Sequence, residues 1–379
     1  MTHKVDVSDG YGLGSLKDGK PPDATDNANY FCEYAFLYHQ MDMLEDAHRT
    51  GAYFNAITWN PASFKDKVVL DVGAGTCILS IFAAKAGAKE VFAVEATDMA
   101  IRGRKIVEAQ GMGHIIKVLQ GTVETVTLPS KVDVIISEWM GYLLLRESML
   151  DSVLIARDRF LKPGGALFPS HATLYLAPVG AAKACREKQQ SFDGERQHWE
   201  DFNGTMRKWY GTDFACMRDE FLEEQRKYYL QTGMFVNLSP KQLVGDGSPL
   251  LRLDLLTATL EDLKGADKPC TCSMRISKDT QIEGFVGYFD VDFSGSKENP
   301  AKEEVQLTTA PTTETATHWG QQLFGFYPPL QARSGDTLKG TIWIKRQKKN
   351  HRLLHLEASF ELGQSGQVRD KREDSWFVD

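Results

Sequence analysis

The sequence predicts a two-domain protein, with an α/β domain built on a mostly parallel sheet followed by an antiparallel β domain. Its 379 residues exceed the length that one hydrophobic core usually fills, which is about 250–300 residues. In the first half, short runs of β-branched residues alternate with helical stretches, as in proteins with parallel sheets. Beyond about Phe168 apolar and polar residues alternate one by one, which is typical of antiparallel strands with one buried face.

The composition is that of a folded globular protein. Hydrophobic residues make up 42% of the chain and charged residues 25%, close to globular averages. The net charge of −7 favours a cationic partner, and we expect no direct nucleic-acid binding. The start of the chain has no apolar segment, and no run of about 18 apolar residues occurs, so neither secretion nor membrane insertion is expected. Six cysteines without a CxxC pair predict reduced thiols and a cytoplasmic or nuclear location.

Local patterns predict the elements of the first half. Residues 1–29 are rich in Gly, Asp, Pro and Lys and predict a flexible tail. From Tyr30 to Leu44 apolar residues recur at three- and four-residue steps, which predicts a helix with one aromatic, apolar face. The predicted buried strands are Val68–Val72, Glu90–Glu95, Ile115–Leu119 and Val132–Ser137. The predicted crossover helices are Ile78–Ala86, Met99–Gln110 and Leu144–Leu161, and a turn at residues 162–165 ends the series.

The second half predicts a β-barrel or sandwich. Alternating apolar residues run from Phe285 to Phe293 and from Leu354 to Leu362. Further predicted strands are Leu167–Ala177, Leu251–Thr259, Leu323–Tyr327 and Thr341–Lys345. Residues 182–229 are polar, aromatic-spotted and weakly helical, so we expect a projecting arm. The basic run at residues 345–349 predicts a solvated hairpin turn between two strands.

A glycine-rich motif indicates a nucleoside-binding crossover. The segment Val69–Cys77 ends a strand in a Gly-x-Gly turn that opens a helix, where glycines let a ligand approach the backbone. Glu95 ends the next strand about 20 residues on, where an acidic side chain binds ribose hydroxyls. A dinucleotide is disfavoured because Ile78 occupies a position that needs a small residue, and Asp71 would repel a pyrophosphate. Asp71 favours a cationic ligand instead, such as S-adenosylmethionine.

A second motif places two glutamates around an apolar loop. Glu138 follows a predicted strand at the carboxyl edge of the sheet, and Glu147 returns nine residues later. Burying two carboxylates beside the apolar Trp139–Tyr142 stretch is costly unless a cation lies between them. A planar guanidinium satisfies both carboxylates, because its donors form a fixed fork.

Other chemistries fit this pair of glutamates less well. A glycosidase acid–base pair has no need of the nucleoside motif. No metal site is expected, because no histidine or further carboxylate lies at ligand spacing. A third motif, Thr317-His318-Trp319, lies in a threonine-rich loop of the β half and by itself favours packing over catalysis.

Together these motifs resemble those of protein arginine methyltransferases of the asymmetric-dimethylating, type I group, and most of all the compact plant-type members. The motifs are the aromatic helix at residues 30–34, Leu70–Thr76, the loop from Ser137 to Glu147, and Thr317-His318-Trp319. The resemblance extends from Tyr30 to the end of the chain. It implies a Rossmann-like methyltransferase domain over residues 30–168 that uses S-adenosylmethionine, and a β-barrel domain over residues 169–379. It also implies a homodimer in which the arm at residues 182–229 docks on a second subunit.

The resemblance further implies roles for single residues at the cofactor. Arg49 would pair with the methionyl carboxylate, Glu95 with the ribose and Glu124 with the adenine amino group. The full set implied at the cofactor is Gln40, Arg49, Asp71, Gly73, Gly75, Glu95, Val123, Glu124 and Met149.

For the substrate, the resemblance implies that Glu138 and Glu147 clamp the arginine. The side chains implied to line its slot are Tyr34, Met43 and Trp319, and those implied to handle the proton are His318 and Asp46. The implied substrates are Arg/Gly-rich proteins or histone tails, converted to monomethyl-arginine and then to asymmetric dimethyl-arginine.

Two positions depart from the family pattern, and two other functions stay open. Cys77 stands where many relatives have glycine, and Gln40 where many type I members have histidine; both changes are compatible with cofactor binding. A small-molecule guanidine methyltransferase would use the same cofactor motif and would methylate free arginine. A non-catalytic scaffold would bind the cofactor without forming product.

Overall fold

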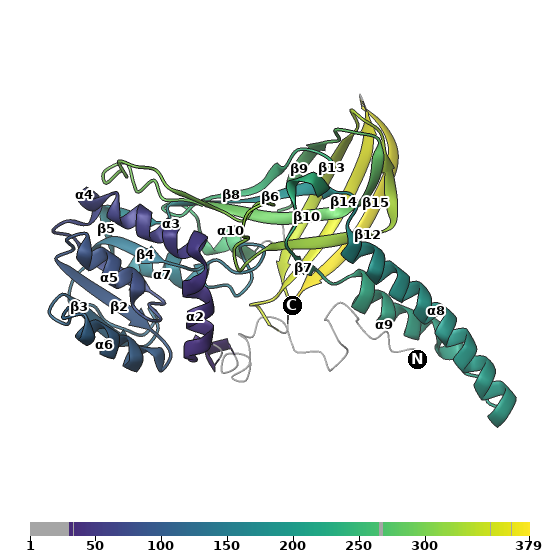
Figure 1. Cartoon of the computed structure of the whole chain (residues 1–379), viewed down its shortest axis with the longest axis horizontal. Coiled ribbons are helices and arrows are strands. Elements are labelled where there is room, and N and C mark those ends of the chain that lie inside the picture. The colour runs from purple at the N-terminus through teal and green to yellow at the C-terminus, as the bar shows by residue number, and fades with distance from the viewer. Residues whose placement is uncertain (1–29, 33, 265–267, 349, 365) are drawn as a thin grey trace.

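The protein consists of a parallel-sheet domain and an antiparallel barrel, with a pair of helices projecting from the barrel (Figure 1). The computed structural model describes residues 30–379, apart from residues 33, 265–267, 349 and 365. The tail predicted at residues 1–29 lies outside the described residues. In the described part of the chain, no helix has the length and apolar character needed to cross a membrane.

A five-stranded parallel sheet, ordered β3-β2-β1-β4-β5, forms the first domain. Its strands are β1 (Val68–Val72), β2 (Glu90–Glu95), β3 (Ile116–Gln120), β4 (Val132–Ser137) and β5 (Leu161–Phe168). Four of them match the predicted strands to within one residue. The turn predicted at residues 162–165 is wrong, because these residues belong to β5, which pairs with β4 across a register shift. The chain reverses its strand order between β1 and β4, and α/β sheets bind ligands at the carboxyl ends beside such a switch.

Residues 30–32 and 34 are helical, and further helices accompany this sheet. They are α2 (Leu37–Glu45), α3 (Ala47–Thr58), α4 (Pro61–Phe64), α5 (Ile78–Lys85), α6 (Met99–Ala109) and α7 (Leu150–Phe160). The single helix predicted from Tyr30 to Leu44 is wrong in one respect: the chain leaves the helical conformation around Phe36 before α2 begins. The apolar face of α2 is also not buried, since Tyr38 is 64% and Met41 55% exposed.

Two antiparallel sheets form the barrel. One has the order β7-β12-β10-β6-β8, with β11 paired to β10, and the other the order β15-β14-β13-β9. The strands of the first are β6 (His171–Val179), β7 (Met234–Val236), β8 (Ser248–Asp254), β10 (Thr280–Asp292), β11 (Gln306–Thr308) and β12 (Gln321–Ala332). Those of the second are β9 (Cys270–Arg275), β13 (Thr337–Arg346), β14 (Leu354–Gln364) and β15 (Gln367–Val378). Phe285, Phe326, Phe360 and Trp376 meet ring to ring between the sheets, so the predicted fold class is confirmed.

The arm is a helical hairpin that leaves the barrel between β6 and β7 (Figure 1). Helix α8 (Lys183–Tyr210) has 28 residues, about 42 Å at 1.5 Å per residue, and α9 (Arg218–Leu230) runs back along it. Trp199 of α8 stacks on Phe221 of α9 with ring centroids 4.7 Å apart. This segment is therefore far more helical than its polar sequence predicts, because the paired helices bury their aromatic residues against each other.

Candidate functional site

A cavity opens at the carboxyl edge of the parallel sheet, with a volume of about 1130 Å³ including its mouth. The sequence-predicted site residues that line it are Tyr34, Gln40, Met43, Arg49, Gly73, Gly75, Glu95, Val123, Glu124, Glu138, Glu147 and Met149. The glycine motif and the two glutamates, which are far apart in sequence, therefore share one cavity. The predicted site residues that do not line it are Asp46, Asp71, His318 and Trp319.

Glu95 is fixed at the end of β2 by three hydrogen bonds. Its Oε2 accepts from the backbone N–H of Gly75 at 2.9 Å. Its Oε1 accepts from the backbone N–H and the hydroxyl of Thr97, at 2.8 and 2.7 Å. The carboxylate is thus held against the glycine turn with its remaining lone pairs available at the cavity.

The glycine turn itself lets other side chains reach the cavity. Gly73 has φ of +72°, which favours glycine, and a Cβ added there would lie 2.3 Å from Cε of Met149 and would displace the end of that side chain. Gln40 donates to the carbonyl of Tyr34 at 3.0 Å and thereby holds the aromatic segment at the cavity wall. Cys77, which stands where many relatives have glycine, adopts φ of 65° just before α5. That left-handed conformation explains the preference for glycine there.

Asp71 lies beneath the cavity and does not face it. The residue is fully buried, and its Oδ2 accepts from the backbone N–H and the hydroxyl of Ser80, at 3.0 and 2.6 Å. Burial raises the pKa of Asp71 to about 7, against the two hydrogen bonds from Ser80, which lower it. The expectation that Asp71 binds the cofactor directly is therefore wrong; the carboxyl ties β1 to helix α5.

Val123 and Glu124 form the far end of the cavity. Glu124 accepts a hydrogen bond from Ser152 at 2.7 Å, which orients its carboxylate beside the first turn of α7. The carbonyl of Val123 accepts from Arg159 and is thereby fixed.

Glu138 is a carboxylate whose two oxygens both have fixed donors. Its Oε1 accepts from the backbone N–H of Met140 at 3.1 Å. Its Oε2 accepts from Nε and Nη2 of Arg49, at 3.1 and 2.8 Å, and only 12% of the Glu138 side chain is exposed. Arg49 also donates to the carbonyl of Met43 at 3.0 Å. Arg49 lines the cavity, and two of its guanidinium nitrogens are directed at Glu138, while its predicted contact with a ligand carboxylate stays a prediction.

Glu147 lies in a strained loop between β4 and α7. Leu143, Leu144, Glu147 and Ser148 all have positive φ, which is costly for residues with a β-carbon. This geometry explains why α7 begins at Leu150 and not at Leu144 as predicted. The loop also requires Gly141, where a Cβ would lie 2.0 Å from the carbonyl oxygen of Arg146.

The Glu147 carboxylate is surrounded by phenols. Tyr34 donates to Oε2 at 2.6 Å, Tyr30 also donates to the carboxylate, and Arg146 lies 3.5 Å away. Burial raises the pKa of Glu147, and Glu138 adds to this, whereas the Tyr34 hydrogen bond and Arg146 lower it. Burial also raises the pKa of Tyr34 well above its ordinary value, so this donor stays neutral.

His318 and Asp46 form the predicted pair, and Asp46 also accepts hydrogen bonds from two backbone N–H groups. Asp46 Oδ2 accepts from Nδ1 of His318 at 2.7 Å and from its backbone N–H at 2.8 Å. Asp46 Oδ1 caps α3 by accepting from the backbone N–H of Arg49. Burial raises the pKa of Asp46, but the hydrogen bonds from His318 and Arg49 outweigh it and bring the pKa to about 2. The pair joins the barrel to the start of the helix that carries Arg49.

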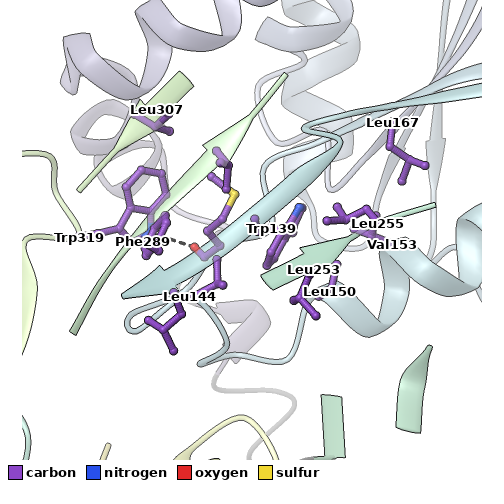
Figure 2. Close-up of a cluster of buried hydrophobic side chains, with 14 of the residues drawn as sticks. Trp139, Leu144, Leu150, Val153, Leu167, Leu253, Leu255, Phe289, Leu307 and Trp319 are labelled. Atoms are coloured by element: carbon purple, nitrogen blue, oxygen red, sulfur yellow. Dashed lines mark hydrogen bonds between the residues drawn. The ribbon is translucent and has the colours of Figure 1, made fainter. Parts of the chain in front are cut away.

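Trp319 is a packing residue of the barrel and not part of the substrate slot. Only 3% of it is exposed, and its indole meets Phe289 edge to face at 5.5 Å (Figure 2). Its Nε1 donates to the carbonyl of Met140 at 2.8 Å. The prediction that Trp319 binds substrate is wrong; the residue anchors the loop that starts at Glu138.

Sequence reasoning missed several lining residues, above all Tyr30 and Arg352. Arg352 follows the basic run that predicted a solvated turn, and its sequence context contains no functional signal. The hairpin between β13 and β14 is present as predicted, but residues 351 and 352 contact the loop of Glu147. Among the described residues, no group of three or more His, Cys, Asp or Glu side chains could hold a metal ion.

The fold and the cavity define a class of protein. The site combines a Rossmann-like parallel sheet with a glycine turn after β1 and an acidic residue at the end of β2. This combination is typical of S-adenosylmethionine-dependent methyltransferases. The family model described as ribosomal protein L11 methyltransferase (PrmA) matches residues 57–170. The model described as arginine methyltransferase oligomerization subdomain matches residues 170–365.

Known proteins define the family more narrowly. The chain is 45% identical over 370 residues to protein arginine N-methyltransferase PRMT10 of Arabidopsis thaliana, covering 97% of this chain and 96% of that protein. The crystal structure of Arabidopsis thaliana protein arginine methyltransferase 10, described as uniquely open, matches with a TM-score of 0.88 and 45% identity, covering 92% of this chain and 100% of that one. The Trypanosoma brucei PRMT1 enzyme–prozyme heterotetrameric complex with AdoHcy matches at a TM-score of 0.76 and 30% identity, covering 92% of this chain and 100% of that one. The chain belongs to the protein arginine N-methyltransferase family, and its cofactor is S-adenosylmethionine.

Proposed function

We propose that the protein methylates arginine residues of Arg/Gly-rich proteins or histone tails, forming monomethyl-arginine and then asymmetric dimethyl-arginine. The observation that carries this proposal is that Glu138 and Glu147 line the same cavity as the glycine turn and Glu95. Two carboxylates beside a nucleoside site match a cationic, planar guanidinium, whose donors form a fixed fork.

The residues present fit the cofactor. When bound, S-adenosylmethionine supplies a methyl group on a positively charged sulfonium. Glu95, fixed by Gly75 and Thr97, would hold the ribose, and Glu124 would hold the adenine. Met149, packed on Gly73, would lie beneath the cofactor.

The two glutamates would activate the substrate by holding its charge. A guanidinium has a pKa above about 12 and delocalised lone pairs, so it is a poor nucleophile. Carboxylates on two sides would localise the positive charge on the nitrogens that face them and leave electron density on the reacting nitrogen. Positioning then supplies most of the remaining rate enhancement.

Glu147 is better suited than His318 to collect the released proton. Glu147 lines the cavity and burial raises its pKa, whereas His318 does not line the cavity and is engaged with Asp46. The proton becomes acidic as the new N–C bond forms, so a carboxylate is a strong enough base.

We also propose a homodimer formed through the arm. Trp209 and Tyr210 at the far end of α8 are 69% and 72% exposed, and such aromatic residues are common at interfaces. The helices over the cofactor side expose a second apolar set, consisting of Phe36, Leu37, Tyr38, Met41, Phe54 and Ile101. The arm of one subunit would cover this set on the other.

Product analysis tests the proposed reaction. The protein is incubated with methyl-labelled cofactor and an Arg/Gly-rich peptide, and the hydrolysed product is separated by chromatography. We expect monomethyl-arginine first and asymmetric dimethyl-arginine later. Symmetric dimethyl-arginine would contradict the product assignment. Equal methylation of free arginine would favour the small-molecule alternative, and cofactor binding without product would favour the scaffold.

A further inference from the structure

Hydrogen bonds hold the hairpin between β13 and β14 against the methyltransferase domain. At its base, Arg346 makes two hydrogen bonds with Asp151 in the first turn of α7, at 2.6 and 2.7 Å. At its tip, the backbone N–H of Arg352 donates to Oδ1 of Asn350 at 3.0 Å, and that of Gln347 donates to the carbonyl of Leu353. A barrel element is therefore fixed next to the loop that carries Glu147.

The hairpin binds both the backbone N–H and the backbone carbonyl of Glu147 in the strained loop. The backbone N–H of Glu147 donates to the carbonyl of Arg352 at 2.6 Å, and Nη1 of Arg352 donates to the carbonyl of Glu147 at 2.7 Å. The hydroxyl of Ser148 donates to the carbonyl of His351 at 2.6 Å. Three short hydrogen bonds thus join two consecutive residues of the loop to two consecutive residues of the hairpin.

These contacts lie where the backbone strain lies. Glu147 and Ser148 have φ of 80° and 57°, a left-handed conformation that is unfavourable for a residue with a β-carbon. Such residues keep this conformation only where the surroundings impose it. Because both peptide groups of Glu147 are bound to Arg352, the direction of its side chain depends on the hairpin.

The guanidinium of Arg352 also contacts the N-terminal aromatic segment. Its Cζ lies 3.8 Å from the ring centroid of Tyr30 and 5.6 Å from that of Phe31, as in a cation–π contact. Tyr30 and Tyr34 pack together at 5.1 Å, and both donate to the Glu147 carboxylate. One side chain therefore links the backbone of Glu147 to the phenols that hold its carboxylate.

We infer that Arg352 is a positioning residue of the active site, which fixes Glu147 and the aromatic segment at residues 30–34 from the barrel side. This inference rests on the proposed role of Glu147 in binding the substrate guanidinium. Both contacts depend on the guanidinium, because the same planar group donates to the carbonyl of Glu147 and covers the ring of Tyr30.

Kinetics of three variants test this role in the full-length protein. We expect Arg352→Met to lower kcat for peptide methylation by about 10²-fold, the order that misplacing a catalytic group by 1 Å costs. Cofactor affinity by calorimetry should change far less than kcat, because Glu95 and Glu124 keep their contacts. Arg352→Lys should give an intermediate kcat, because an ammonium covers the ring but lacks the fork. Lys348→Met, which removes an exposed charge from the same hairpin, should behave as the wild type.

Hydrogen exchange gives a readout that needs no turnover. We expect faster amide exchange in Arg352→Met within residues 30–34 and 141–148, with the barrel strands unchanged. The positioning role is wrong if Arg352→Met has the same kcat as Lys348→Met. It is also wrong if kcat, cofactor affinity and melting temperature all fall together in Arg352→Met, because that result indicates general destabilisation. If Arg352→Met does not fold, the exchange and kcat of Arg352→Lys decide in the same way. A wild-type protein without methyl transfer would instead overturn the proposed function, while the exchange result would still report on the positioning.

Discussion

At the scale of single residues, Glu138 and Glu147 differ in the donors that hold them. Glu138 is bound by a guanidinium and a backbone N–H, which are both permanent donors. Glu147 is bound by the phenol of Tyr34, and burial raises its own pKa. Of the two, Glu147 is the carboxylate whose pKa burial raises, which suits the proton-accepting role proposed for it.

Removing either carboxylate should slow methyl transfer strongly. We expect Glu138→Gln and Glu147→Gln each to lower kcat by about 10²–10³-fold, because a neutral amide cannot localise the charge of the guanidinium. Initial rates with an Arg/Gly-rich peptide measure this, and Glu304→Gln, which alters an exposed glutamate, serves as the control. Methyl transfer that survives both changes would exclude the proposed clamp.

The acid limb of the pH–rate profile should report Glu147. Its raised pKa means that activity is full above this pKa and is lost as the pH falls through it, because the protonated acid does not hold a cation. The Tyr34 hydrogen bond lowers this pKa, so Tyr34→Phe should move the acid limb to higher pH. Tyr175→Phe, on the barrel, should leave the limb in place. A limb that stays fixed or moves to lower pH in Tyr34→Phe would rule out Glu147 as its source.

At the scale of elements, the active-site loops are held by neighbours that come from the other half of the chain. The loop that starts at Glu138 is tied to the barrel by Trp319, and the start of α3 by the pair of His318 and Asp46. Thr317-His318-Trp319 is thus a structural link whose effect on chemistry passes through the residues it fixes.

Weakening this link should reduce stability and activity together. Trp319→Phe keeps an aromatic ring against Phe289 but leaves the buried carbonyl of Met140 without its donor. We expect the free energy of unfolding to fall by about 1–3 kcal/mol, with a lower kcat. Equilibrium denaturation measures the first effect, and Trp59→Phe, which alters an indole that is 54% exposed, is the control. An unchanged stability in Trp319→Phe would contradict the role given to this hydrogen bond.

At the scale of the whole molecule, the two halves make extensive polar contacts besides those at the cavity. The side chain of Asn60, between α3 and α4, donates to the carbonyl of Glu303 and accepts from its backbone N–H, both at 2.8 Å. Arg157 of α7 donates to the carbonyls of Leu255 and Ala258 in the barrel. Within the described part of the chain, the helical arm extends away from this joined body (Figure 1).

Changing the end of the arm should abolish the dimer. We expect the double variant Trp209→Ala, Tyr210→Ala to sediment as a monomer where the wild type sediments as a dimer, because it loses two exposed aromatic anchors. Val368→Ala, at an exposed apolar residue of β15, should keep the dimer. A monomeric wild type at micromolar concentration would contradict the assembly itself.

The parallel sheet was predictable from sequence because its strands are buried on both faces. Runs such as Val68–Val72 and Val132–Ser137 are mainly apolar and do not alternate between polar and apolar residues, which is typical of strands buried on both faces. The glycine turn directly follows β1, and the acidic residue Glu95 ends β2. The twelve predicted residues that line the cavity lie on these strands, on the loops that follow them, or on the helical segments that precede β1.

The remaining features depend on contacts between distant parts of the chain. Residues 162–165, predicted as a turn, lie within β5 at the register shift between its pairs with β4, and the helix expected from Leu144 begins later because of the strained loop. Asp71 and Trp319 carry suitable chemical groups, but burial removes both from the cavity. Arg352 lies some 200 residues after Glu147, and only tertiary structure brings them together.

The hydrogen bonds between the barrel hairpin and Glu147 have a consequence for protein engineering. A fragment that ends at the close of β5 would contain the complete cofactor half, yet it would lack the partners of Glu147, Met140 and Asp46. Such a fragment should still recognise the cofactor but fail as a catalyst. Grafting this half onto a foreign barrel should succeed only when the graft brings the hairpin and the Thr317-His318-Trp319 loop with it. We therefore expect catalysis by this protein to need both of its domains.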